Sequence, residues 1–171
     1  MRRSCLILLV SAAPLAAQQQ SDANVGVRAA RAHWRTVHGY IQAAAEQLPE
    51  SLYNFKPTPA VRSFAELFGH IAGSEFMFCA PVRGDAPRAE DDVESKVKDK
   101  AGLVKALKDA AAYCEAAYAV SDAEGAKMVD LFGQRSKLNT LVFNATHDGE
   151  HYGNIVTYMR IKGLVPPSSQ R

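Results

Sequence analysis

Apolar residues recur at steps of three and four in four segments of the chain, which is the spacing of one face of an α-helix. Prolines and turn-forming residues separate these segments. The expected helices cover about 22–48, run from Ser63 to just before Pro81, start after Asp99, and run from near Ser136 to Lys162. No segment alternates with a period of two for long enough to predict a strand.

Each expected helix has its own apolar stripe. The stripes are Trp34, Val37, Ile41, Ala45 and Leu48 in the first helix, Phe64, Leu67, Ile71 and Phe78 in the second, Leu103, Leu107, Ala110, Cys114 and Ala117 in the third, and Leu138, Leu141, Val142, Ala145, Tyr152, Val156 and Met159 in the fourth. Amphipathic helices bury such stripes against one another. The pattern therefore predicts an all-α fold, a four-helix bundle.

Several residues mark the helix ends. Ser63 and Glu66 form the S-x-x-E pattern of a capping box, and Asp99 is a suitable N-cap for the third helix. Gly163 fits the C′ position after the last helix, and the prolines at 166–167 prevent that helix from restarting.

The connection 81–98 is rich in proline, glycine and charge, and is expected to be exposed. A connection of this length can carry the chain back along the bundle, so the second and third helices can run parallel. Cys79 and Cys114 would then both lie roughly 23 Å from the starts of their helices. At the same height they could form a disulfide, and the alternative is two small buried thiols.

The first residues have the pattern of a secretory signal. Arg2 and Arg3 precede the apolar run 5–10, and small residues follow up to Ala17. We expect residues 1–17 to be a cleaved signal peptide, with an uncleaved anchor as the alternative, and 22–168 to form one domain. The protein would be periplasmic or extracellular, an oxidising environment in which a disulfide is stable.

Cleavage would leave equal numbers of basic and acidic residues. A neutral chain without a basic run is a poor candidate for binding nucleic acid. No other stretch is long and apolar enough to be an integral membrane segment.

The histidines carry the clearest chemical signal. His147 and His151 are four apart, so both imidazoles lie on one face of the fourth helix and can share one metal ion. His70 would be a third ligand, because it lies roughly 15 Å from the same end of the bundle as His147 if their helices are antiparallel. His33 and His38 are interpreted as bystanders, although one of them could line the site from the first helix.

The face with His147 and His151 lies opposite the apolar stripe of its helix, beside Asn144 and Tyr158. It contains aromatic and amide groups but few charges, which favours a pocket wall or a subunit interface over a solvated surface. The string H-x-x-E-H also matches an inverted zinc-protease motif. That interpretation is disfavoured, because only a short segment follows His151.

Three segments resemble the DinB/YfiT-like superfamily of metal-dependent proteins. They are PESLYNFKPTP at 49–59, SFAELFGHIAG at 63–73 and HDGEHYGNIVTYMRIKGLVPP at 147–167. The resemblance covers about 25–168. It implies an up-down-down-up four-helix bundle, usually a homodimer, with a metal triad formed by His70, His147 and His151.

The expected function is an exported, divalent-metal-binding protein, namely a hydrolase- or transferase-type enzyme with an open coordination position. Zinc or nickel would be the cofactor, and Glu150 or Tyr158 would assist catalysis. Relatives implied by the resemblance use low-molecular-weight thiols, but such thiols are chiefly cytosolic, and export therefore weakens this substrate expectation. The alternatives are a non-catalytic metal-binding or stress-related module and a scaffold with a vacant site.

Overall fold

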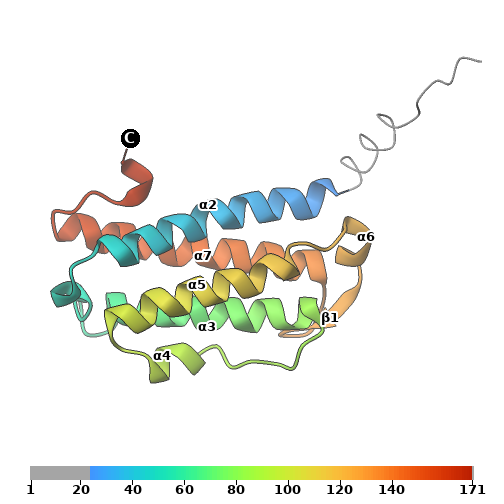
Figure 1. The fold of residues 1–171 in the computed structure, drawn as a ribbon, viewed down its shortest axis with the longest axis horizontal. Helices are drawn as coiled ribbons and strands as arrows, with labels where there is room; N and C mark the ends of the chain where they lie inside the picture. The colour runs from blue at the N-terminus through green and yellow to red at the C-terminus, as the bar shows by residue number, and fades with distance from the viewer. Residues whose placement is uncertain (1–23, 171) are drawn as a thin grey trace, which may run out of the picture.

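Four long helices form the framework of the protein in the computed structural model, which describes residues 24–170 (Figure 1). They are α2 (Val25–Gln47), α3 (Phe64–Arg83), α5 (Lys100–Ala117) and α7 (Lys137–Ile161). In Figure 1, α3 and α5 run in one direction and α2 and α7 in the other. The all-α, up-down-down-up prediction is therefore confirmed. The predicted signal peptide and the start of the first predicted helix lie outside the described residues.

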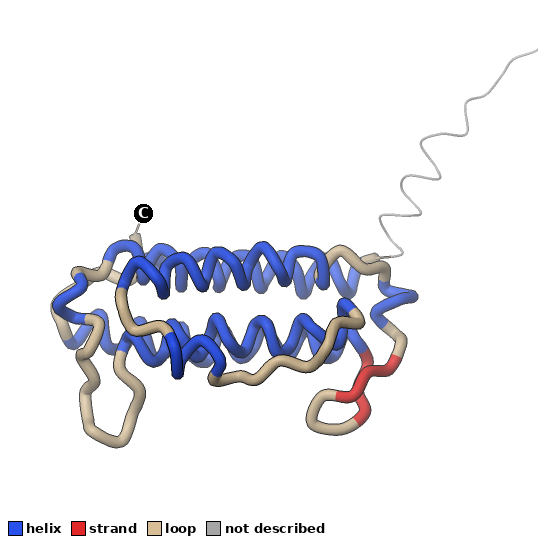
Figure 2. The backbone as a smooth tube through the Cα atoms, turned by 60° about the horizontal axis from the view of Figure 1, so that its bottom comes forward, coloured by secondary structure: helices blue, strands red, loops and turns tan. Residues whose placement is uncertain are grey.

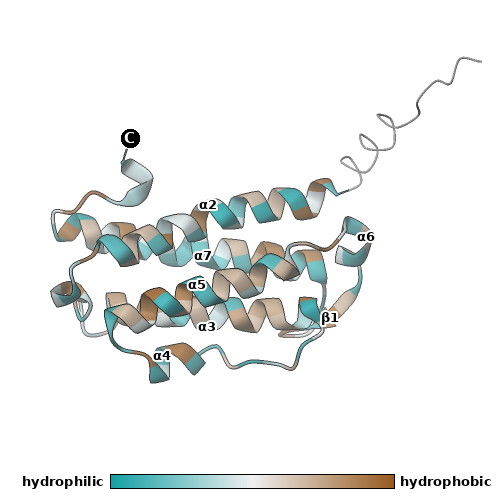
Figure 3. Ribbon diagram, in the orientation of Figure 1, coloured by the Kyte–Doolittle hydropathy of each residue, from teal (hydrophilic) through white to brown (hydrophobic). Residues whose placement is uncertain are grey.

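The apolar stripes meet in the centre of the bundle. α3 packs against both α5 and α7, and α2 packs against α7 and α5. Of the 20 residues of α3, only Glu66, Phe76, Pro81 and Arg83 are not buried. Figure 3 accordingly shows α3 in brown tones along most of its length, whereas α2 presents many hydrophilic residues on its outer side. The predicted stripes of the first three helices are entirely buried.

The capping signals act as expected. The backbone N–H of Glu66 donates to Ser63 Oγ at 3.3 Å, and the N–H of Ser63 donates to Glu66 Oε2 at 2.6 Å. Asp99 Oδ1 accepts from the N–H of Gly102 at 2.8 Å. Gly163 has a φ of 71°, the left-handed conformation that ends a helix.

One predicted helix end was wrong. α3 does not end before Pro81 but continues to Arg83. A proline in the last turn removes one backbone hydrogen bond, which the tightly buried helix tolerates. The helix ends instead at Gly84, whose φ of 81° is the left-handed conformation that glycine adopts without strain.

The connection between α3 and α5 is not simply exposed, which corrects the sequence prediction. It contains the short helix α4 (Asp92–Lys96), which packs against α3. Figure 2 shows the loop before α4 running along the outside of the bundle. Gly69 and Gly73 allow this approach: a Cβ atom on Gly69 would lie only 2.8 Å from the Cα atom of Glu94.

A short hairpin was also not predicted. Strands β1 (Met128–Asp130) and β2 (Gln134–Ser136) pair antiparallel, with Met128 opposite Ser136. Three residues per strand are too few for an alternating pattern to be visible. The hairpin follows the short helix α6 (Asp122–Gly125) and lies at the end of the bundle where α7 begins (Figure 2). Two 3₁₀ turns, Glu50–Leu52 and Pro167–Ser169, complete the elements of residues 24–170.

The parallel arrangement of α3 and α5 brings the two cysteines together. The Cα atoms of Cys79 and Cys114 lie 5.4 Å apart, and their sulfur atoms lie at disulfide distance, 2.02 Å. Both side chains are fully buried. Among the described residues, no helix is long and apolar enough to cross a lipid bilayer.

Candidate metal centre

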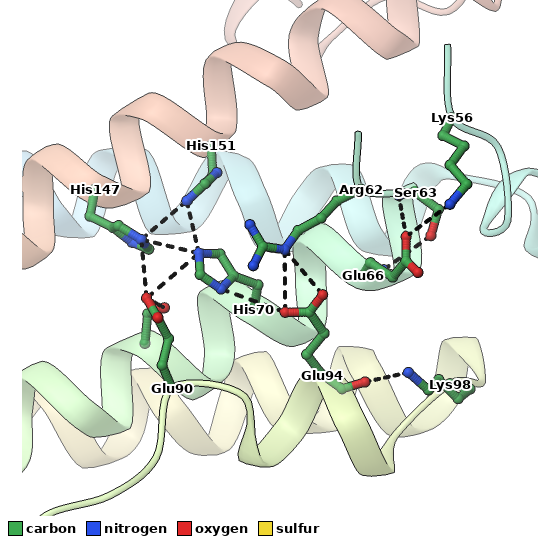
Figure 4. A network of polar contacts seen from close by, with 11 residues as sticks. Lys56, Arg62, Ser63, Glu66, His70, Glu90, Glu94, Lys98, His147 and His151 are labelled. Atoms are coloured by element: carbon green, nitrogen blue, oxygen red, sulfur yellow. Dashed lines mark hydrogen bonds and ion pairs between the residues drawn. The ribbon is translucent and has the colours of Figure 1, made fainter. Parts of the chain in front are cut away.

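Three histidines from two helices meet inside the bundle (Figure 4). The Nε2 atom of His70, on α3, lies 3.0 Å from that of His151 and 3.2 Å from that of His147, both on α7. The Nε2 atoms of His147 and His151 are 3.1 Å apart. The structure thus brings together the three residues that the sequence identified as a candidate metal triad.

The face of α7 that carries these histidines is turned toward α3. Tyr158 and His151 line a pocket, as predicted, but Asn144 is fully buried. Val142, which was assigned to the apolar stripe, is 42% exposed. The physical reason is that α7 packs against both α2 and α3, so its buried arc is shifted toward the face that carries His151, and Val142 falls outside it.

Burial keeps the three imidazoles neutral. It lowers the pKa of His70 to about 3 and the pKa values of His147 and His151 to about 4, and the nearby positive charge of Arg62 acts in the same direction. The Nδ1 atoms of all three have no hydrogen-bond partner among the described residues. When each Nδ1 atom carries the ring hydrogen, the three Nε2 lone pairs crowd one small space. A cation among them would remove this repulsion.

The spacing of the three nitrogens fits such a cation. Imidazole nitrogens bind zinc at about 2.0–2.1 Å, so two nitrogens of a tetrahedral site lie about 3.3 Å apart. The observed separations of 3.0, 3.1 and 3.2 Å are close to this value. Three protein ligands leave one position open, as in catalytic zinc sites. Imidazole also suits nickel, copper and iron, so the ligands do not define the ion.

Two carboxylates from the connection between α3 and α5, here called the crossover, lie over the triad. Glu90 Oε1 is 3.8 Å from the Nε2 atoms of both His70 and His147, and it accepts a hydrogen bond from Ser74 Oγ at 3.1 Å. Glu94 Oε2 lies 3.6 Å from Nδ1 of His70. Arg62 in turn donates to Glu94 at 3.0 Å (Figure 4). The sequence did not reveal Glu90 and Glu94, because the segment between α3 and α5 shows no pattern that relates it to the histidines.

A pocket of about 480 Å³ opens beside His151. Its walls include the cationic side chains Lys56 and Arg62 and the phenol of Tyr158. Both cations have acidic neighbours, since Lys56 lies 3.8 Å from Glu66 and Arg62 pairs with Glu94. The pocket is large enough for a small molecule that reaches the triad.

The other predicted residues are differently placed. Glu150 is on an exposed face of α7, and its charge opposes the burial that lowers the pKa of His151. Tyr158 is 6% exposed, and burial raises the pKa of its phenol. His33 is exposed, in agreement with its interpretation as a bystander. His38, in contrast, is buried in a second polar cluster.

This second cluster consists of His38 on α2, Glu75 on α3 and Asp148 on α7. One ligand-type atom from each lies within 4.8 Å of the others. Glu75 Oε1 accepts from Trp34 Nε1 at 2.7 Å and is 2.8 Å from His38 Nδ1. Burial and the charge of Glu75 raise the pKa of Asp148 well above its usual range.

Sequence reasoning missed Glu75 and Asp148, although a signal was present. Asp148 is seven residues after Leu141 and four before Tyr152, so it falls on the apolar stripe of its own helix. Glu75 is likewise four residues after Ile71. An acidic residue on a buried stripe is the unusual observation, because isolated charges are seldom buried without a partner.

Comparisons with known proteins agree with this architecture. Residues 33–155 match the family described as the DinB superfamily. A DinB-like protein from Bacillus cereus is 15% identical, with a TM-score of 0.66 over 78% of this chain and 91% of that one. The DinB-like protein YjoA from Bacillus subtilis is 24% identical, with a TM-score of 0.65 over 82% and 97%. No curated protein matches the sequence.

Proposed function

The chain belongs to the DinB superfamily, and from this premise we propose that it is an exported, metal-dependent enzyme of hydrolase or transferase type. His70, His147 and His151 would hold one divalent ion, with zinc or nickel as the candidates. The observation that carries the proposal is the convergence of three neutral imidazoles, whose Nε2 atoms lie 3.0–3.2 Å apart. Three nitrogen lone pairs directed at one point repel one another, and a bound cation removes this repulsion.

A divalent ion bound there would polarise a carbonyl or lower the pKa of a bound water or thiol. Side chains of the protein would accept the proton and hold the ligands in place. Glu90 is the carboxylate closest to the metal-facing nitrogens, at 3.8 Å, and can accept a proton there. Glu94 Oε2 lies 3.6 Å from Nδ1 of His70, beyond hydrogen-bond distance, and would orient the ring as a carboxylate behind a ligating histidine once this gap closes.

The pocket beside His151 would bind the substrate. Lys56 and Arg62 line this pocket together with their acidic partners Glu66 and Glu94, so it offers groups of both charges to a polar substrate. Tyr158 stays protonated at neutral pH, since burial raises its pKa, and it can donate a hydrogen bond to a substrate oxygen. Glu90 replaces Glu150 as the favoured proton acceptor, because Glu150 is exposed.

Export and dimerisation complete the proposal. A disulfide between Cys79 and Cys114 suits an oxidising compartment, which supports export. Exposed apolar residues near the hairpin support a homodimer contact. They are Met128, Phe132, Val142 and Phe143. Size-exclusion chromatography with light scattering tests the oligomeric state.

The first experiment measures metal content by elemental mass spectrometry on untagged protein. His147→Ala is compared with His33→Ala, a matched control that removes an exposed histidine outside the triad. We expect His33→Ala to keep the metal of the unmodified protein and His147→Ala to lose the ion of the triad. Equal metal content in both variants would exclude the triad as the binding site. Bound metal without turnover of ester, amide or thiol substrates would favour a non-catalytic module.

A further inference from the structure

A second candidate site lies at the junction of α2, α3 and α7, formed by His38, Glu75 and Asp148. All three side chains are buried: His38 is 4% exposed, and both carboxylates are fully buried. Their ligand-type atoms lie within 4.8 Å of one another. No residue of the histidine triad belongs to this cluster, although Asp148 directly follows His147 in the chain.

The cluster has more acceptors than donors. Trp34 and His38 both donate toward a single oxygen, Oε1 of Glu75. Oε2 of Glu75, both carboxylate oxygens of Asp148 and Nε2 of His38 have no hydrogen-bond partner among the described residues. Buried polar atoms are normally paired, and unpaired ones carry a substantial free-energy cost. Unpaired atoms of this kind, gathered in one place, therefore need an explanation.

The cluster also carries two acidic groups without a matching positive charge. Glu75 and Asp148 are two acids in a region from which water is excluded, and within the described chain neither forms an ion pair with a lysine or arginine. Two buried carboxylates repel each other, and burial together with the charge of Glu75 raises the pKa of Asp148, so the pair needs either a shared proton or a cation between the two acids. His38 is the ion-pair partner of Glu75, and one imidazole cannot balance both acids.

A buried amide lies one turn of helix from Asp148. Asn144 is one turn before Asp148 on the same face of α7. Its Nδ2 atom donates to the hydroxyl of Tyr118 at 3.1 Å. This bond fixes the amide, and its Oδ1 atom remains buried without a donor among the described residues. The two carboxylates of the cluster together with its one imidazole form a ligand set suited to hard divalent ions such as Mn²⁺.

We propose that His38, Glu75 and Asp148 form a second, buried binding site for a divalent cation, distinct from the three-histidine centre. The two carboxylates neutralise the charge of the ion, and the imidazole nitrogen completes a set of three protein ligands. Its oxygen-rich ligands favour Mn²⁺-like ions, whereas the all-imidazole triad favours zinc-like ions. Because the two sites share no ligand, this inference holds whether or not the triad is catalytic.

The test uses untagged protein produced in medium supplemented with Mn²⁺ and Zn²⁺. The double variant Glu75→Gln/Asp148→Asn keeps the size of both side chains and removes their charges. A second double variant, His70→Ala/His147→Ala, removes the triad instead, and His33→Ala serves as the control. Metal content is measured by elemental mass spectrometry, and protein-bound Mn²⁺ by electron paramagnetic resonance.

We expect about two divalent ions per chain in the unmodified protein and in His33→Ala, and about one in each double variant. The bound Mn²⁺ signal should survive in His70→Ala/His147→Ala and disappear in Glu75→Gln/Asp148→Asn. If Glu75→Gln/Asp148→Asn holds as much metal as the unmodified protein, the proposal is wrong, and the two acids share a proton instead. Loss of all bound metal from His70→Ala/His147→Ala in a folded state would overturn it as well.

A second measurement is independent of variant folding. Anomalous X-ray scattering from crystals of the Mn²⁺-loaded, unmodified protein should show a peak between His38, Glu75 and Asp148. A peak at the triad alone, with none at this cluster, would overturn the proposal.

Discussion

The backbone carbonyl of Glu90 occupies the space in which the Cβ atom of any larger residue at position 73 would stand. This contact fixes the crossover on the surface of α3, one turn from His70. It therefore links a glycine in a buried helix to the position of a carboxylate over the metal centre, because Glu90 Oε1 lies 3.8 Å from two of the three histidines.

Gly73→Ala is predicted to destabilise the protein by about 1–3 kcal/mol, the usual cost of overpacking a close contact. The added methyl group would push the crossover away from α3 and displace Glu90. Urea denaturation measures the change in the free energy of unfolding. The matched control is Gly39→Ala, an exposed helical position with no atom within 4 Å of the added Cβ. At position 39 alanine should stabilise the helix by up to about 1 kcal/mol. An equal change in the free energy of unfolding in both variants would contradict a close contact between Gly73 and Glu90.

The fold was largely predictable because its signals are local. Helix stripes such as Trp34, Ile41 and Leu48 repeat at 3.6-residue spacing, and the caps at Ser63 and Asp99 act within one turn. All of these were confirmed. The hairpin and α4 were not predictable, since each is too short to show a period, and α4 is held by tertiary contacts with Gly69 and α3.

The candidate site was predictable only in part, for a related reason. The spacing of His147 and His151 is visible in the sequence, and His70 could be matched to them by its height in the bundle. Glu90 could not be assigned to the site from the sequence, because its position depends on how the connection between α3 and α5 packs. The buried acids Glu75 and Asp148 were detectable as charges on apolar stripes, but their meeting required the three-dimensional structure.

Reduction of the Cys79–Cys114 bond is predicted to lower stability by about 3–4 kcal/mol. The two cysteines are 35 residues apart, and a cross-link over this distance restricts the unfolded chain by about that amount. Thermal unfolding with and without a thiol reductant measures the effect. In Cys79→Ala/Cys114→Ala the reductant should change nothing, and an equal loss of stability in that variant would refute the prediction.

Glu90→Gln is predicted to weaken zinc binding by about tenfold, a typical effect for a carboxylate that supports the ligands of a metal. Its charge lies near His70 and His147 and favours a cation there. Glu150→Gln is the matched control, because Glu150 neighbours His151 in sequence but is exposed. Competition with a chelator measures both affinities. A larger loss in Glu150→Gln than in Glu90→Gln would reverse the roles assigned to the two acids.

The metal-free protein is predicted to lose stability as the pH falls below about 6.5. Burial lowers the pKa of His70 to about 3 and the pKa values of His147 and His151 to about 4. In the unfolded chain a histidine has a pKa of about 6.5, so between these values the unfolded state binds protons that the folded state excludes. Stability therefore decreases toward low pH, by about 2 kcal/mol between pH 6.5 and pH 5 for each histidine that stays neutral.

Urea denaturation in the presence of a chelator, at pH 7.5, 6.5, 5.5 and 5.0, measures this effect in the unmodified protein and in His70→Ala/His147→Ala/His151→Ala. The difference between the two proteins isolates the triad. His38 acts in the opposite sense: burial lowers its pKa, but Glu75 outweighs burial and raises it, so its contribution is present at low pH and is lost as the pH rises. Both proteins contain His38, and its effect cancels. Parallel pH profiles would mean that the triad histidines are not held neutral in the folded protein.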